Sequence, residues 1–185
     1  MQCPFSHSFY SSFNLKSIGQ QAEKYFILLC KRKQLKNCYK LNLLMKKLIA
    51  VCGSDEDDRT LTEYTLKTAE RVGELIAERG AILVCGGRGG IMKAACKGAK
   101  KKNGITVGIL PGNKSDANEF IDIPIATDLG NLRNYLVVKS ADAVIGIGGR
   151  WGTLNEISFA MILEKPLILI KNTGCLLYTS PSPRD

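Results

Sequence analysis

Three glycine-rich turns contain the residues best suited to bind an anionic ligand. Glycine lets backbone N–H groups approach a phosphate closely, and a helix that follows adds the positive end of its dipole. Tight packing between a strand and a helix also selects glycine, so a single turn of this kind is a weak signal. Three such turns, each after an apolar segment, favour phosphate binding over a purely structural role. The candidate residues are Gly53, Ser54, Gly86, Gly87, Gly89, Gly90, Gly148, Gly149, Gly152 and Thr153.

Glu156 and Arg133 are the candidates for charged roles. Glu156 falls in the predicted first turn of the helix after Gly152-Thr153, where an acid interacts favourably with the helix dipole. This position is also close enough to act on a ligand held by the turn. Arg133 falls near the start of another predicted helix, an unfavourable place for a cation, which indicates an anionic partner: a substrate phosphate or Glu156. A solvated surface arginine is the alternative. Trp151 either stacks on a base or caps the core.

Other chemical signatures are incomplete. The spacing Gly146-x-Gly148-x-x-x-Gly152 is similar to a dinucleotide fingerprint, but the next apolar strand ends without an acid for a ribose hydroxyl. The single histidine, His7, lies far from the glycine turns, which argues against a histidine-based triad and the usual histidine zinc sites. The three cysteines within residues 45–174 are not paired as C-x-x-C, which predicts buried, reduced thiols in a cytoplasmic protein. We therefore expect no metal and no cofactor.

Apolar segments alternate with helical patterns through the middle of the chain. Strands are predicted at 47–52, 81–85, 105–110, 121–125, 143–147 and 166–170. Helices are predicted at 60–79, 91–102, 131–141 and from the last glycine turn to about 164. Strands that are apolar on both faces predict an α/β fold, a Rossmann-like doubly wound parallel sheet in three layers. Such sheets bind ligands beyond the carboxyl ends of their strands, where all three glycine turns fall.

The two ends of the chain differ from the middle. Most of the net charge of +9 belongs to residues 1–44, which have no sustained helical or strand period. We interpret Met45 as the start of the domain and 1–44 as a non-native or disordered leader. Residues 175–185 resemble a translated sequencing adaptor, so the domain at 45–174 is expected to be C-terminally truncated. The charge distribution predicts a small-molecule partner and no nucleic acid, and no apolar run approaches the roughly 20 residues of a membrane span.

The combined motifs resemble the Lonely Guy superfamily. Those motifs are Gly86-Gly-Arg-Gly-Gly-Ile-Met92, Arg133-Asn134 and Gly148-Gly-Arg-Trp-Gly-Thr-Leu-Asn-Glu156. The best-known members are cytokinin riboside 5′-monophosphate phosphoribohydrolases, often labelled lysine decarboxylase-like. The resemblance runs from about residue 47 to residue 170. It implies that Glu156 and Arg133 are the catalytic pair, adds Asn134 to the substrate-binding residues, and implies a homodimer formed by helix packing.

The chain departs from the superfamily pattern at two places. Ile147 replaces the motif proline, and the arginine motif reads Leu132-Arg133-Asn134-Tyr135. These features are more similar to a bacterial and archaeal branch, to which molybdenum-cofactor carrier proteins are also similar. The resemblance therefore implies two functions: hydrolysis of the N-glycosidic bond of a nucleoside 5′-monophosphate, or non-catalytic carriage of a phosphorylated pterin or nucleotide. Nothing in the sequence marks a pyridoxal-binding lysine, so the decarboxylase label has no support.

Overall fold

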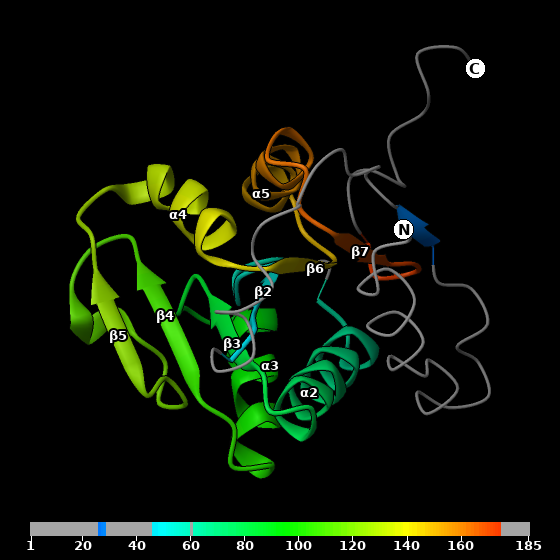
Figure 1. Ribbon diagram of the computed structural model, residues 1–185, viewed down its shortest axis with the longest axis horizontal. Coiled ribbons are helices and arrows are strands. Elements are labelled where there is room, and N and C mark those ends of the chain that lie inside the picture. Colours follow the sequence, from blue (N-terminus) through cyan, green and yellow to red (C-terminus); the bar gives the residue numbers. More distant parts are fainter. Residues whose placement is uncertain (1–25, 29–45, 60, 175–185) are drawn as a thin grey trace, which may run out of the picture.

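The protein forms a seven-stranded sheet in three layers, seen in the computed structural model of Figure 1, which describes residues 26–28, 46–59 and 61–174. The strands are β1 (Phe26–Leu28), β2 (Leu48–Gly53), β3 (Ile82–Cys85), β4 (Thr106–Leu110), β5 (Ile123–Ala126), β6 (Ala143–Ile147) and β7 (Leu167–Ile170). Their order in the sheet is β1-β7-β6-β2-β3-β4-β5. Strands β2 to β7 are parallel, and β1 is antiparallel to β7. The predicted Rossmann-like parallel sheet is confirmed.

In the described part of the chain, four α-helices cover the two faces of this sheet. They are α2 (Glu63–Glu78), α3 (Gly90–Lys101), α4 (Arg133–Ser140) and α5 (Trp151–Ile162), with short 3-10 helices η2 (Lys114–Asp116) and η3 (Gly130–Leu132). Helices α2 and α3 lie on one face, and α4 and α5 lie on the other (Figure 1). Each pair closes its own apolar cluster against the sheet, because alternate side chains of every strand point to opposite faces. The strands are therefore buried on both sides over most of the sheet.

The start of α2 is fixed by a capping box. The Thr62 hydroxyl accepts a hydrogen bond from the Thr65 N–H at 3.2 Å, and the Thr65 hydroxyl accepts one from the Thr62 N–H at 2.9 Å. These two bonds satisfy backbone donors that the first turn leaves without helical partners. The helix thus begins later than the predicted residue 60, because local side-chain capping sets the boundary rather than the apolar period.

The outer strand β5 is the exception to the predicted burial. Ile123 and Ile125 are 49% and 44% exposed, although their segment was predicted to be covered on both faces. This expectation is wrong for β5, because it is the last strand of the sheet. Edge strands have a neighbour on one side only and reach beyond the helices that cover the centre.

The predicted boundaries of the domain stay predictions. Within residues 1–44 the structure describes Phe26–Leu28 alone, which pairs through its backbone with β7. The proposed tail, 175–185, lies outside the described residues. No helix in the described part of the chain is both long and apolar enough to span a bilayer.

Candidate functional site

The topology places the switch point of the sheet between the carboxyl ends of β2 and β6. The chain runs outward from β2 through β3, β4 and β5, and then returns to β6 on the other side of β2. Ligands of open α/β sheets bind at such a switch point. Gly53 at the end of β2 pairs with Ile147 at the end of β6, so the turns that follow lie side by side. A Cβ atom on Gly148 would lie 3.4 Å from the Ser54 hydroxyl, which brings two of the three predicted turns together.

The turn before α5 is built from glycines for backbone reasons. Gly148 and Gly149 have φ values of 62° and 106°, in the region that side chains with a Cβ rarely adopt. The Gly148 N–H donates to the Thr173 hydroxyl at 2.8 Å. Thr173 was missed by the sequence analysis, because nothing in the sequence connects it with a turn so far upstream. The turn is thus anchored to the segment after β7.

The amino end of α5 carries no side-chain cap. Helix α5 begins at Trp151, with Arg150 at the N-cap position, and among the described residues no side-chain capping hydrogen bond is made there. Uncapped N–H groups and the positive end of the helix dipole together suit an anion. Gly152 lies in this first turn, and no described residue outside the turn would lie within 4 Å of a Cβ atom on it. Among the predicted phosphate-binding turns, this one is open to a ligand.

The turn before α3 is occupied by an acid of the chain itself. The Gly89 N–H donates to Asp55 Oδ1 at 3.0 Å, and the Ile91 N–H donates to the Ser54 carbonyl at 2.9 Å. The Arg88 Nε lies 3.1 Å from Asp55 Oδ2. A phosphate at this turn would have to displace the Asp55 carboxylate. Phosphate binding by Gly86 to Gly90 therefore stays a prediction, and the contacts of Asp55 with Gly89 and Arg88 argue against it.

Arg133 and Glu156 form a buried ion pair. Their residues are 8% and 5% exposed, and Arg133 Nη1 lies 3.4 Å from Glu156 Oε1. The interpretation of Arg133 as a solvated surface arginine is wrong. A Cβ atom on Gly86 would lie 2.5 Å from Arg133 Nη2, so Gly86 makes room for the guanidinium. The Arg133 Nε is buried and has no hydrogen-bond partner among the described residues.

Asn134 joins α4 to the α5 turn. Its Nδ2 donates to Asn155 Oδ1 at 3.1 Å and approaches the Gly152 carbonyl at 3.4 Å, while its Oδ1 accepts from Arg133.

The predicted place of Glu156 in the first turn of its helix is wrong, because α5 begins at Trp151 and puts Glu156 in the second turn. The helix dipole therefore does not explain this acid. Trp151 itself is 76% exposed, so its interpretation as a cap on the core is also wrong.

Burial raises the pKa of Glu156 to about 7, which is the dominant effect on this carboxyl. The charge of Arg133 and hydrogen bonds from Cys52 and Arg133 lower the pKa, but they do not cancel the desolvation. Burial, and then the nearby Glu156, raise the pKa of the Cys52 thiol well above its ordinary value. The sequence analysis treated Cys52 only as a buried thiol, and its contact with Glu156 depends on how α5 packs over β2.

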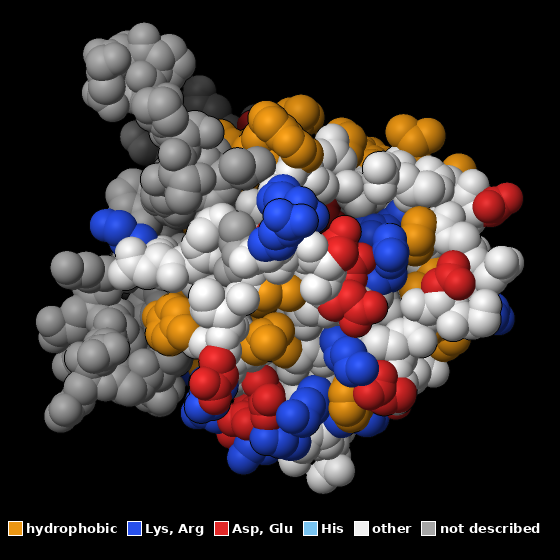
Figure 2. Space-filling model, turned by 180° about the vertical axis from the view of Figure 1, so that it is seen from behind, with side chains coloured by type: hydrophobic (Ala, Val, Ile, Leu, Met, Phe, Trp, Pro, Cys, Tyr) orange, Lys and Arg blue, Asp and Glu red, His pale blue; other side chains and the backbone are white. Residues whose placement is uncertain are grey.

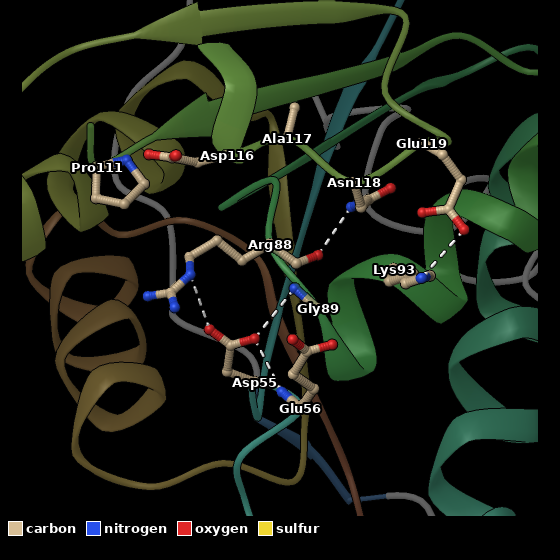
Figure 3. A pocket seen from close by; sticks show the side chains of 10 residues that line it. All are labelled: Asp55, Glu56, Arg88, Gly89, Lys93, Pro111, Asp116, Ala117, Asn118 and Glu119. Atoms are coloured by element: carbon tan, nitrogen blue, oxygen red, sulfur yellow. Dashed lines mark hydrogen bonds and ion pairs between the residues drawn. The ribbon is translucent and has the colours of Figure 1, made fainter. Parts of the chain in front are cut away.

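A polar pocket of about 590 Å³ opens beside the α3 turn (Figure 3). It lies between the loop after β2, the start of α3 and the connection from β4 to β5. Its lining residues are Asp55, Glu56, Arg88, Gly89, Lys93, Pro111, Asp116, Ala117, Asn118 and Glu119. Asn118 Nδ2 donates to the Arg88 carbonyl at 2.8 Å, which fixes the β4–β5 connection against the α3 turn. In the parts of the chain that the structure describes, no group of three or more His, Cys, Asp or Glu side chains is placed to hold a metal ion.

Three known proteins are similar to this chain. An uncharacterized protein of Archaeoglobus fulgidus is 51% identical over 123 residues, which are 66% of this chain and 79% of that protein. The structure of the molybdenum cofactor binding protein from Rippkaea orientalis is 44% identical, with 68% of this chain and 77% of that chain covered and a TM-score of 0.65. The molybdenum cofactor carrier protein from Chlamydomonas reinhardtii is 38% identical, with coverage of 67% and 76% and a TM-score of 0.62.

A sequence model of the SLOG cluster4 family matches residues 46–183. This range contains all three glycine turns and the pair formed by Arg133 and Glu156, and it extends past Gly174 into the predicted tail. The match covers most of the chain, and its placement agrees with the superfamily that the motifs indicated. The chain therefore belongs to the SLOG cluster4 family, within the Lonely Guy/SLOG-like superfamily.

Proposed function

We propose that this protein binds a phosphorylated pterin of the molybdenum-cofactor class and carries it without chemical turnover. The observation that carries the proposal is the uncapped amino end of α5, at the switch point between β2 and β6. This end offers backbone N–H donors and a helix dipole to a phosphate. The similarity to two proteins described as binding or carrying the molybdenum cofactor, at 44% and 38% identity, supports a pterin as the remainder of the ligand.

The buried pair of Arg133 and Glu156 favours a carrier over a hydrolase. A phosphoribohydrolase needs an anion beside the ribose to stabilise an oxocarbenium-like transition state. Burial raises the pKa of Glu156 to about 7, so its charged form is disfavoured, and its carboxylate is already bound by Arg133. Both side chains are almost fully buried. We infer that the pair joins α4 to α5 and so supports the ligand turn.

Hydrolysis of a nucleoside 5′-monophosphate is the second candidate function, and one specific observation favours it. A carboxyl with a pKa of about 7 is suited to proton transfer at neutral pH, and such groups concentrate at catalytic sites. In that case Glu156 would orient or deprotonate the attacking water, and Arg133 would fix its position.

Glu156→Gln separates the two functions. We expect the wild-type chain to bind a phosphorylated pterin and to release no free base from AMP or GMP, and the variant to keep its affinity, because glutamine replaces the protonated carboxyl. Binding is measured by titration calorimetry and base release by chromatography. Glu164→Gln, an exposed change just after α5, is the matched control. Release of base by the wild type that Glu156→Gln abolishes and Glu164→Gln preserves would assign a hydrolase instead.

We further propose a homodimer formed by the α4–α5 layer. Figure 2 shows hydrophobic side chains gathered along the upper edge of the molecule, where these helices lie. Six large apolar side chains of this layer and its entrance are exposed: Leu129, Leu132, Tyr135, Trp151, Met161 and Ile162. Large apolar side chains exposed together on one layer indicate an interaction site.

Ile162→Lys should convert the dimer to a monomer, because a buried lysine in an apolar interface leaves its charge without solvent. Ile162 is 74% exposed in the single chain, so the substitution should not disturb the fold. Tyr64→Lys, on the opposite layer, is the control and should leave the dimer intact. The measurement is light scattering after size-exclusion chromatography. A wild-type monomer would overturn the proposal.

A further inference from the structure

The polar pocket of Figure 3 and the α5 turn lie next to each other at the same edge of the sheet, the one formed by the carboxyl ends of the strands. Ser54 lies against the Gly148 turn, and the next residue, Asp55, lines the pocket. Gly86 lies against the Arg133 guanidinium, and Gly89 of the same turn lines the pocket. A ligand with its phosphate on the α5 turn would therefore extend its other end into this pocket. This step rests on the proposed function, which places the phosphate at α5.

The pocket is unsuited to hold the phosphate itself. Four of its lining residues are acids (Asp55, Glu56, Asp116 and Glu119), against two bases, Arg88 and Lys93. The Asp55 carboxylate already accepts the Gly89 N–H at the amino end of α3, the position that an anion would take. A second anion beside it would be repelled. The uncharged part of the ligand is the part that fits here.

Most of the charged groups in the pocket are already paired with each other. Asp55 Oδ1 accepts the N–H groups of Gly89 and Glu56 at 3.0 and 2.9 Å, and Asp55 Oδ2 lies 3.1 Å from Arg88 Nε. Glu119 is paired with Lys93 at 3.1 Å (Figure 3). These contacts hold the walls together, and they occupy the Asp55 carboxylate, the Lys93–Glu119 pair and the Nε of Arg88.

Two groups stay available. Among the described residues, the carboxylate of Glu56 makes no hydrogen bond or ion pair, and it lies directly over Gly89, where a Cβ atom would be 2.6 Å from Glu56 Oε2. Arg88 is paired through Nε alone, and its two terminal nitrogens lie below Pro111 in Figure 3 without a partner among the residues drawn. The pocket thus offers a pair of acceptor oxygens and a pair of donor nitrogens.

We propose that this pocket binds the 2-amino-4-oxopyrimidine edge that pterin and guanine share. That edge presents a ring N–H and an adjacent exocyclic amine, which the Glu56 carboxylate accepts together, and a carbonyl oxygen, to which Arg88 donates. Adenine lacks both the carbonyl and the paired N–H donors, so it would leave Glu56 and Arg88 without hydrogen bonds. Gly89 contributes to the same site, because a side chain there would displace the Glu56 carboxylate from its present position.

The test compares dissociation constants of the 185-residue chain for GMP, AMP and 6-hydroxymethylpterin phosphate, measured by titration calorimetry. GMP should bind at least about tenfold more tightly than AMP, and Glu56→Gln should remove this preference by weakening GMP and leaving AMP unchanged. Asp57→Asn is the matched control: it removes the same charge from the next residue of the loop, which does not line the pocket. It should preserve the ratio of GMP to AMP affinity.

Each outcome decides the proposal. Equal affinities for GMP and AMP, or an equal loss of both in Glu56→Gln, would overturn the assignment of the pocket but leave phosphate binding at α5 intact. No binding of any of the three compounds would overturn both the pocket and the proposed function. If the preference for GMP over AMP depends on Glu56, tighter binding of the pterin phosphate than of GMP identifies a pterin as the natural ligand, and the reverse order identifies a guanine nucleotide.

Discussion

Gly152→Val should weaken the binding of a phosphorylated ligand at least about tenfold without lowering the midpoint of thermal unfolding. A side chain at Gly152 has open space around it in the part of the chain that the structure describes, where the Cβ position of Gly152 has no neighbour within 4 Å. Valine also has a better helix propensity than glycine, so α5 itself should tolerate the change. The affinity for the ligand should fall, because the two methyl groups of valine would block access to the uncapped N–H groups of the first turn.

The control for this prediction is Gly149→Val, three residues earlier in the same turn. Gly149 has a φ of 106°, and a Cβ atom there would overlap the side chain of Thr153, so this variant should lose stability as well as ligand binding. Affinity is measured by calorimetry with GMP and with the pterin phosphate, and stability by thermal unfolding. If Gly152→Val binds both ligands as tightly as the wild type, the phosphate does not lie on the α5 turn.

Arg133→Met should destabilise the fold by about 3–5 kcal/mol at pH 8 and by much less at pH 5. At pH 8 the variant leaves Glu156 charged and buried with its ion-pair partner removed. At pH 5 the carboxyl is protonated and neutral, because its pKa is already about 7 beside Arg133 and should rise further without that charge. Methionine fills much of the arginine volume, so the dominant loss is electrostatic.

The sign of the pH dependence follows from the proton that Glu156 holds. Its pKa is raised from the ordinary 4.5 to about 7 in the folded protein, so the folded state binds this proton more tightly than the unfolded chain. The resulting stability is fully present below pH 4.5 and is lost as the pH rises to about 7. Glu156→Gln should remove this dependence, since glutamine does not titrate.

Denaturant unfolding of four proteins between pH 5 and pH 8 measures both effects. These proteins are the wild type, Arg133→Met, Glu156→Gln and the double variant. The double variant should be more stable than Arg133→Met at pH 8, because it contains no unpaired buried charge. A loss of stability in Arg133→Met that is the same at both pH values would show that the guanidinium contributes by packing and not by its charge.

The sequence alone determined the fold and the edge of the sheet that carries the site. Apolar strands alternate with helical patterns, and this local periodicity is enough to predict a parallel sheet with helices on both faces. The glycines of the turn before α5 could be recognised for the same reason: the positive φ values of Gly148 and Gly149 are a local backbone requirement. The positions of strands β2 to β7 along the chain were predicted within a few residues at each end, and so was their parallel arrangement.

Only the tertiary structure decided which hydrogen-bonding and charged groups at that edge of the sheet already have partners within the protein. Asp55 fills the amino end of α3, Thr173 anchors the Gly148 turn, and Cys52 contacts Glu156. These partners are far apart in the chain, and no periodicity constrains which side chain reaches a given N–H group. The burial of Arg133 could not be predicted from the sequence either. It depends on the space that Gly86 leaves for the guanidinium, and this space forms only when two separate elements pack together. Local patterns follow from the preferences of each segment, whereas pairing, desolvation and the pKa of Glu156 arise only when the segments pack.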